Sequence, residues 1–95
     1  MFNIINFMTI NIKHLKNKII YRANYRGTKE MDKLLSTFTN AYIDQLLTEE
    51  LLLLSDLLDY DDENLYKFNQ GLQLRIEIKK NKVTELFKNY KYVSE

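Results

Sequence analysis

The sequence predicts a small all-α protein, a single-domain bundle of about five helices. The 95-residue chain contains no proline and only two glycines, so few residues interrupt regular structure. Along most of its length apolar residues recur every three or four positions, the spacing that gives a helix one buried face. A chain of this size builds one modest core and one domain.

The first two helices are predicted at residues 11–24 and 28–42, after an N-terminal extension at residues 1–10 that either frays or packs on the core. Residues 11–95 then form the helical domain. The first buried stripe is Ile12, Leu15, Ile19 and Ala23. The second is Met31, Leu34, Leu35, Phe38 and Tyr42.

The third helix is predicted from Thr48, a good N-cap followed by two glutamates, to about residue 60. Its buried face holds Leu51, Leu54, Leu57 and Leu58. The fourth helix begins with Asp61 or Asp62 as its cap, buries Leu65 and Phe68, and ends at Gly71.

The last helix is predicted from residue 72 to residue 92. Its first part, residues 72–78, alternates apolar and polar residues as a strand does. An isolated strand would have no partner, because no other segment alternates as well. Val83, Leu86, Phe87 and Tyr90 return to helical spacing, so we predict helix throughout.

The composition argues against several classes of protein. The absence of cysteine excludes disulfides, a thiol nucleophile and cysteine-based metal sites, and it fits a reducing compartment. A metal site is not expected, because His14 is the only histidine and the acids at residues 59–63 lack the spacing of a calcium loop. No glycine-rich phosphate loop and no serine beside a histidine base occurs, so we expect no enzyme.

The net charge of +1 hides an uneven distribution. Residues 13–33 are mainly basic, every charged residue in 44–63 is acidic, and residues 67–91 are mainly basic again. Such segments neutralise one another when helices pack side by side; the alternative is a polar surface shaped for one protein partner. A nucleic-acid surface would carry a larger excess of Lys and Arg.

The apolar start of the chain does not predict membrane insertion. Residues 1–8 are interrupted by asparagine and lack the basic start and cleavage site of a signal peptide. They are also too few to span a bilayer, which takes about 20 apolar residues.

The candidate functional residues are Arg26, Gly27, Glu30 and Asp32, clustered ahead of the second predicted helix. Gly27 can take backbone angles closed to its neighbours, and Thr28 can cap the helix. The cluster has a purely structural interpretation as well. Acids favour the first turn of a helix, and Arg26 with Glu30 could form a surface ion pair worth less than about 1 kcal/mol.

The order of motifs favours a functional interpretation. Arg26-Gly27-Thr28-Lys29-Glu30-Met31-Asp32 is followed by Leu47-Thr48-Glu49-Glu50 and then by Leu57-Leu58-Asp59-Tyr60-Asp61-Asp62-Glu63-Asn64-Leu65-Tyr66-Lys67-Phe68. Over residues 20–71 this order resembles the succinate dehydrogenase assembly factor family. Thr28 stands where methionine is usual, Glu63 where proline is common, and Phe68 near a common tryptophan.

The resemblance implies an assembly chaperone that acts in the bacterial cytoplasm as a monomer. It would bind the flavoprotein subunit of succinate dehydrogenase, with fumarate reductase as a second candidate, and promote covalent attachment of FAD. Arg26, Gly27, Glu30 and Asp32 would bind this partner. FAD would belong to the partner, and this chain would hold no cofactor stably.

Two alternatives remain from the residues alone. One is a helical interaction module with a different partner. The other is a small DNA-binding protein that uses the basic first and last helices.

Overall fold

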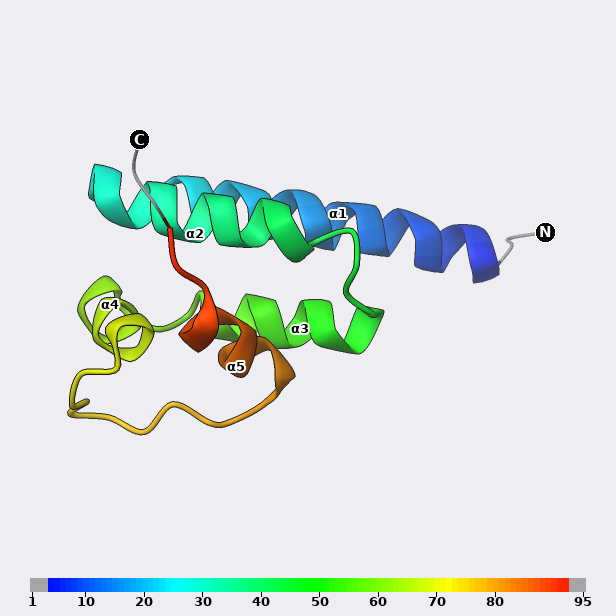
Figure 1. The fold of residues 1–95 in the computed structure, drawn as a ribbon. Helices are drawn as coiled ribbons and strands as arrows, with labels where there is room; N and C mark the ends of the chain where they lie inside the picture. Colours follow the sequence, from blue (N-terminus) through cyan, green and yellow to red (C-terminus); the bar gives the residue numbers. More distant parts are fainter. Residues whose placement is uncertain (1–3, 93–95) are drawn as a thin grey trace.

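The computed structural model describes residues 4–92, and their side chains from residue 11 onward. Five helices occur there, with no strand, so the predicted all-α class is confirmed (Figure 1). Their bounds are α1 Ile4–Asn24, α2 Lys29–Tyr42, α3 Thr48–Leu57, α4 Asp62–Gln70 and α5 Lys82–Asn89.

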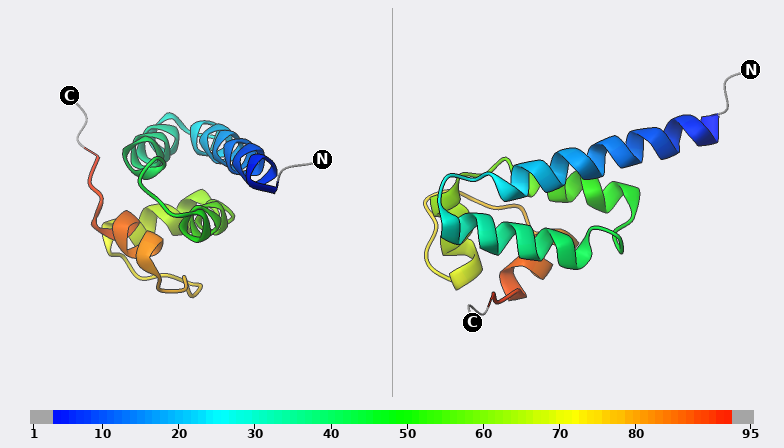
Figure 2. Two further views of the ribbon diagram at one scale, coloured as in Figure 1. Left: turned by 90° about the vertical axis from the view of Figure 1, so that its right-hand side faces the viewer. Right: turned by 90° about the horizontal axis from the view of Figure 1, so that it is seen from above.

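The helices form two layers. α1 and α2 run side by side and cover the three shorter helices, and the N-terminal part of α1 extends beyond them (Figures 1 and 2). In the second layer α3 and α4 each contact α5, and α3 also contacts α1. The start of α2 and the whole of α4 lie at the same end of the molecule (Figure 1).

The core lies between the layers and draws on all five helices. Its centre is Phe38, which is 1% exposed. Its ring centroid lies 5.1 Å from that of Phe87, 5.3 Å from that of Tyr42 and 5.4 Å from that of Tyr90. The buried apolar residues are Ile19, Ala23, Met31, Leu34, Leu35, Phe38, Ile43, Leu51, Leu54, Leu57, Leu58, Leu65, Val83 and Phe87, which confirms most of the predicted buried faces. The other predicted residues pack against this core but are only partly buried: Ile12, Leu15, Tyr42, Phe68, Leu86 and Tyr90.

Several helix ends follow local rules. The Thr28 side chain caps α2 by accepting a hydrogen bond from the Met31 amide at 3.2 Å. Gly71 ends α4 in the left-handed conformation, with φ 73°. Both caps confirm predictions, and Asp61 is the N-cap of α4.

The boundaries of α1 and α3 differ from the prediction. α1 begins at Ile4 rather than near residue 11, because nothing in residues 4–10 stops a helix. The extension at residues 1–10 was expected either to fray or to pack on the core, and its side chains lie outside the described part of the chain. α3 ends at Leu57, and its N-cap is Leu47 rather than Thr48, because the Glu50 carboxylate reaches back to accept the Leu47 amide at 2.8 Å.

The predicted helix from residue 72 is wrong before residue 82. Residues 72–81 form an irregular connection, and α5 begins at Lys82 with Asn81 as its cap. The Asn81 side chain accepts the Thr84 amide at 2.9 Å, and the Thr84 hydroxyl accepts the Asn81 amide at 2.8 Å. An alternating sequence would place its apolar side chains all round a helix rather than on one face, so this segment had no helical stripe to bury.

Glu50 joins α3 to α5. Its side chain is 11% exposed and forms a 2.8 Å ion pair with the ammonium of Lys82. The hydrogen bond from Lys82, and then that from the Leu47 amide, lower the pKa of the Glu50 carboxyl from its ordinary value of 4.5.

Phe38→Ala should destabilise the protein by about 3–5 kcal/mol, because it removes a buried ring around which three aromatic side chains pack. Urea unfolding followed by circular dichroism measures the change. Leu52→Ala is the matched control, since Leu52 is 53% exposed and should shift stability by less than about 0.5 kcal/mol. Equal shifts for the two variants would contradict the assigned core.

Glu50 should make the stability of the protein sensitive to acid. A carboxyl with a lowered folded pKa contributes stability that is complete above its unfolded pKa, near 4.5, and is lost as the pH falls through the folded pKa. Urea midpoints measured from pH 6 downward should therefore fall more steeply below about pH 4.5 in the wild type than in Glu50→Gln. If the urea midpoints of the two proteins fall in parallel with pH, the Glu50–Lys82 ion pair does not persist in solution.

Candidate functional site

The predicted site lies at the turn between α1 and α2. Gly27 has φ 130°, in the range that L side chains rarely adopt. A Cβ atom there would meet Asp62 Oδ2 at 3.8 Å, an ordinary contact. The backbone conformation, rather than lack of space, is what requires glycine at this position.

Arg26 points into the protein and holds the turn between α3 and α4. Its Nη1 donates to the Leu58 carbonyl at 2.7 Å and its Nη2 to the Tyr60 carbonyl at 2.6 Å. Its Nε donates to Asp62 Oδ1 at 2.8 Å, and the side chain is 11% exposed. Carbonyls at the end of a helix have no partner within it, so the guanidinium supplies the missing donors after α3.

Asp32 fixes the turn between α1 and α2. Its Oδ1 accepts the backbone N–H of Arg26 at 2.5 Å. The acids that contact Arg26 are thus Asp32 and Asp62. The Arg26–Glu30 ion pair considered from the sequence does not form, because the guanidinium turns toward α4 while Glu30 is exposed.

Arg22 has a similar role that the sequence pattern did not single out. From the last turn of α1 it donates to the Ser55 carbonyl at 3.2 Å and to its hydroxyl at 3.1 Å, and it pairs with Asp59. The signal for these contacts was the acidic segment at residues 44–63. The predicted neutralisation between segments is confirmed by the pairs Lys16–Asp44, Arg22–Asp59, Arg26–Asp62 and Lys82–Glu50.

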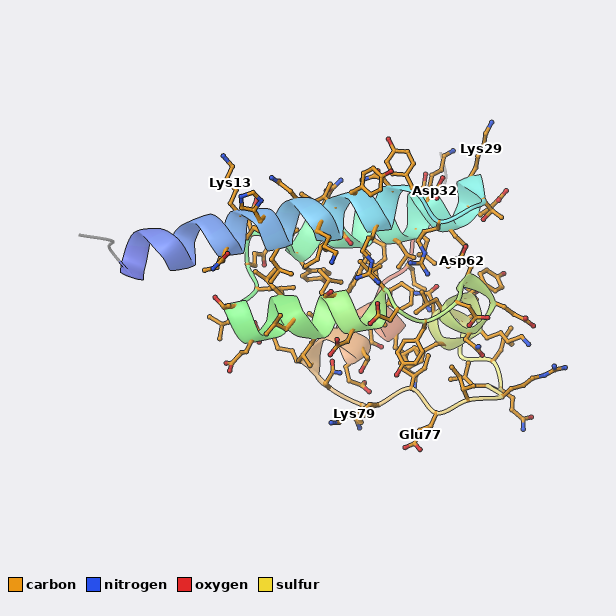
Figure 3. The ribbon with its side chains drawn as sticks, turned by 180° about the vertical axis from the view of Figure 1, so that it is seen from behind. Lys13, Lys29, Asp32, Asp62, Glu77 and Lys79 are labelled. Atoms are coloured by element: carbon orange, nitrogen blue, oxygen red, sulfur yellow. The ribbon has the colours of Figure 1, made fainter. Side chains whose placement is uncertain are left out.

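The structure therefore divides the predicted site residues into two sets. Arg26 and Asp32 are partly buried within the turn, whereas Gly27 and Glu30 are exposed together with Lys29. Figure 3 shows Lys29 projecting outward at this end of the molecule, with Asp32 and Asp62 closer to the turn.

A groove adjoins the exposed set between α2, α4 and the segment after α5. It consists of two cavities of about 280 and 310 Å³ that share Glu30 and Tyr92 as lining residues. We call it the α2–α4 groove. The first cavity is lined by Glu30, Met31, Leu34, Tyr66, Asn69, Gln70, Lys91 and Tyr92, and the second by Lys29, Glu30, Lys33 and Tyr92.

Neither a metal site nor a membrane span is found within residues 4–92. No group of three or more His, Cys, Asp or Glu side chains is placed to hold a metal ion there. No helix in that range has the length and apolar character needed to cross a bilayer.

Comparison with known proteins assigns the chain to a family. A family model described as the flavinator of succinate dehydrogenase matches residues 17–91, which include the α1–α2 turn, the α3–α4 turn and α5. The chain belongs to this family. The resemblance predicted from residues 20–71 is thus confirmed, and the match to the family model extends through α5.

A curated relative of the flavinator family supports the assignment. The FAD assembly factor SdhE of Acetobacter pasteurianus (strain NBRC 105184 / IFO 3283-01) is 30% identical over 78 residues, covering 82% of this chain and 69% of the relative. No solved structure matches. The alternatives of an unrelated interaction module and a DNA-binding protein receive no support from these matches.

Arg26→Lys and Arg26→Ala should both destabilise the protein by about 2–3 kcal/mol, because alanine leaves all the internal acceptors without a donor and lysine lacks the planar fork that meets them together. Thermal and urea unfolding measure the loss. Arg75→Ala is the control, since Arg75 is exposed in the connection before α5 and should change stability by less than about 0.5 kcal/mol. If Arg26→Ala unfolds at the wild-type midpoint, the guanidinium does not hold the α3–α4 turn in solution.

Proposed function

We propose that this chain is an assembly chaperone that binds the flavoprotein subunit of succinate dehydrogenase and promotes covalent attachment of FAD to it. The observation that carries the proposal is the family match over residues 17–91, which spans every predicted site residue. The flavoprotein of fumarate reductase is a second candidate partner. The chaperone acts as a monomer in the bacterial cytoplasm, FAD stays with the partner, and this chain is not an enzyme in the usual sense.

A chaperone of this kind works by binding one conformation of its partner more tightly than others. Preferential binding of the conformation that reacts with FAD raises its population, and the chaperone needs no reactive group of its own. The required difference in binding free energy between the two conformations is small, since a tenfold shift in population corresponds to about 1.4 kcal/mol.

The partner-binding face is centred on Gly27, Lys29 and Glu30. Glu30 is exposed beside the groove, and its carboxylate can accept hydrogen bonds from a basic group of the partner. Gly27 allows close approach of the backbone. Arg26 and Asp32 contribute by holding the turn, since their hydrogen bonds lie within the chain.

Glu30→Ala and Gly27→Val should each lower covalent flavin on the partner subunit by about tenfold, the effect of losing about 1.4 kcal/mol of binding to the reactive conformation. The measurement is flavin fluorescence of the partner on a denaturing gel, in cells whose own copy of the gene is deleted. Glu30→Ala is the cleaner variant, because valine at φ 130° also strains the turn.

Lys13→Ala is the matched control, since Lys13 lies on α1 at the opposite end of the molecule from Lys29 (Figure 3). It should leave covalent flavin unchanged. If both the Glu30 and the Gly27 variants support normal covalent flavin, the cluster serves only to start α2. The assigned partner-binding face would then be wrong.

A further inference from the structure

We propose that the α2–α4 groove receives a segment of the partner flavoprotein in which an apolar side chain lies next to carboxylates. This inference rests on the function proposed above and extends it. It extends the proposed partner-binding face, which shares Lys29 and Glu30 with the groove, and specifies the chemistry of the segment that fills the groove.

The apolar part of the groove is suited to an apolar side chain of a partner. Met31 and Leu34 form its base, and both are at least nine-tenths buried. Tyr66 is 49% exposed and Tyr92 is 37% exposed, so two aromatic side chains offer surface to a partner. The cavity over this base has a volume of about 280 Å³ and adjoins the second cavity of about 310 Å³.

The charges around the groove select an acidic segment. Lys29 and Lys33 line one cavity and Lys91 lines the other, against the single carboxylate of Glu30. Within residues 11–92 neither Lys29 nor Lys33 joins an ion pair, whereas Lys16, Lys67 and Lys82 each have an acidic partner. The Lys91 ammonium donates to the carbonyls of Asn69 and Lys88, which leaves its charge unbalanced. This excess of positive charge is complementary to carboxylates.

The wall that carries Tyr92 is fixed before any partner binds. Asn69 is 1% exposed and donates to the Phe87 carbonyl at 2.8 Å and to the Tyr90 carbonyl at 2.7 Å. Lys91 returns a hydrogen bond to the Asn69 carbonyl. These bonds attach the segment after α5 to α4, so the groove exists in the free protein and little entropy is lost in forming it.

A protein segment fits this groove better than nucleic acid does. The phosphates of a nucleic acid would pair with the lysines but would leave the apolar base of Met31 and Leu34 uncovered. A side chain on the base with carboxylates toward Lys29 and Lys33 satisfies both parts.

The test measures the affinity of the purified flavoprotein subunit for the full chain by isothermal titration calorimetry. Lys29→Glu with Lys33→Glu should raise the Kd by about tenfold or more, and so should Tyr66→Ala. Lys79→Glu with Lys80→Glu makes the same change in net charge on the far side of the molecule, where Figure 3 shows Lys79, and should stay within about twofold of wild type. Added salt should weaken the wild type more than the Lys29/Lys33 variant.

The outcomes separate the groove from the proposed function. If wild type binds and the groove variants bind equally well, the groove inference is wrong and the proposed function stands. Equal losses of affinity in the two double charge-reversal variants would mean that net charge alone causes the effect. The groove inference would then also be wrong. If wild type does not bind the flavoprotein at all, both proposals fail. Circular dichroism melting verifies that each variant is folded.

Discussion

One guanidinium sets the geometry of the end of this molecule that carries its candidate site. Arg26 connects the turn after α1 to the turn after α3 through two carbonyls and a carboxylate. The planar fork of arginine holds its donors in a fixed geometry that meets these three acceptors together, whereas the donors of a lysine ammonium converge on one atom at the end of a flexible stem. Because α4 begins at Asp62, the same contact places α4 opposite the start of α2. The groove lies between these helices with Glu30 among its lining residues, and Gly27 and Glu30 are both exposed.

This arrangement changes how the Arg-Gly-x-x-Glu-x-Asp motif is understood in this chain. A short motif ahead of a helix suggests a row of residues that all meet one partner. Here Arg26 and Asp32 make their hydrogen bonds inside the protein, and Gly27 and Glu30 remain at the surface. Loss of function on replacing Arg26 would therefore be no evidence of contact with the partner. Glu30, which is exposed, separates binding from folding more cleanly.

The features that the sequence predicted well are those determined by neighbouring residues. The stripe containing Phe38, the Thr28 cap and the Gly71 end each depend on residues within about two turns. The partners of the Arg26 guanidinium are more than 30 residues away, and no local pattern identifies which acid reaches it. The segmented charge predicted that basic and acidic helices would pair, but not that Asp62 rather than Glu30 would meet Arg26. The irregular connection before Lys82 was missed because its alternation fits neither a buried helix face nor a sheet with a second strand.

A chaperone of the proposed kind acts through the shape of its surface, and around the groove that shape is fixed by buried polar contacts. Arg26 positions one side of the groove and Asn69 the other, each by hydrogen bonds to backbone carbonyls at or near a helix end. A surface held in this way loses little conformational entropy on binding. More of the interaction energy then remains to favour one conformation of the partner over another, and only that difference shifts the partner's equilibrium. The polar contacts that stabilise the fold thus also prepare the surface on which the proposed chaperone function depends.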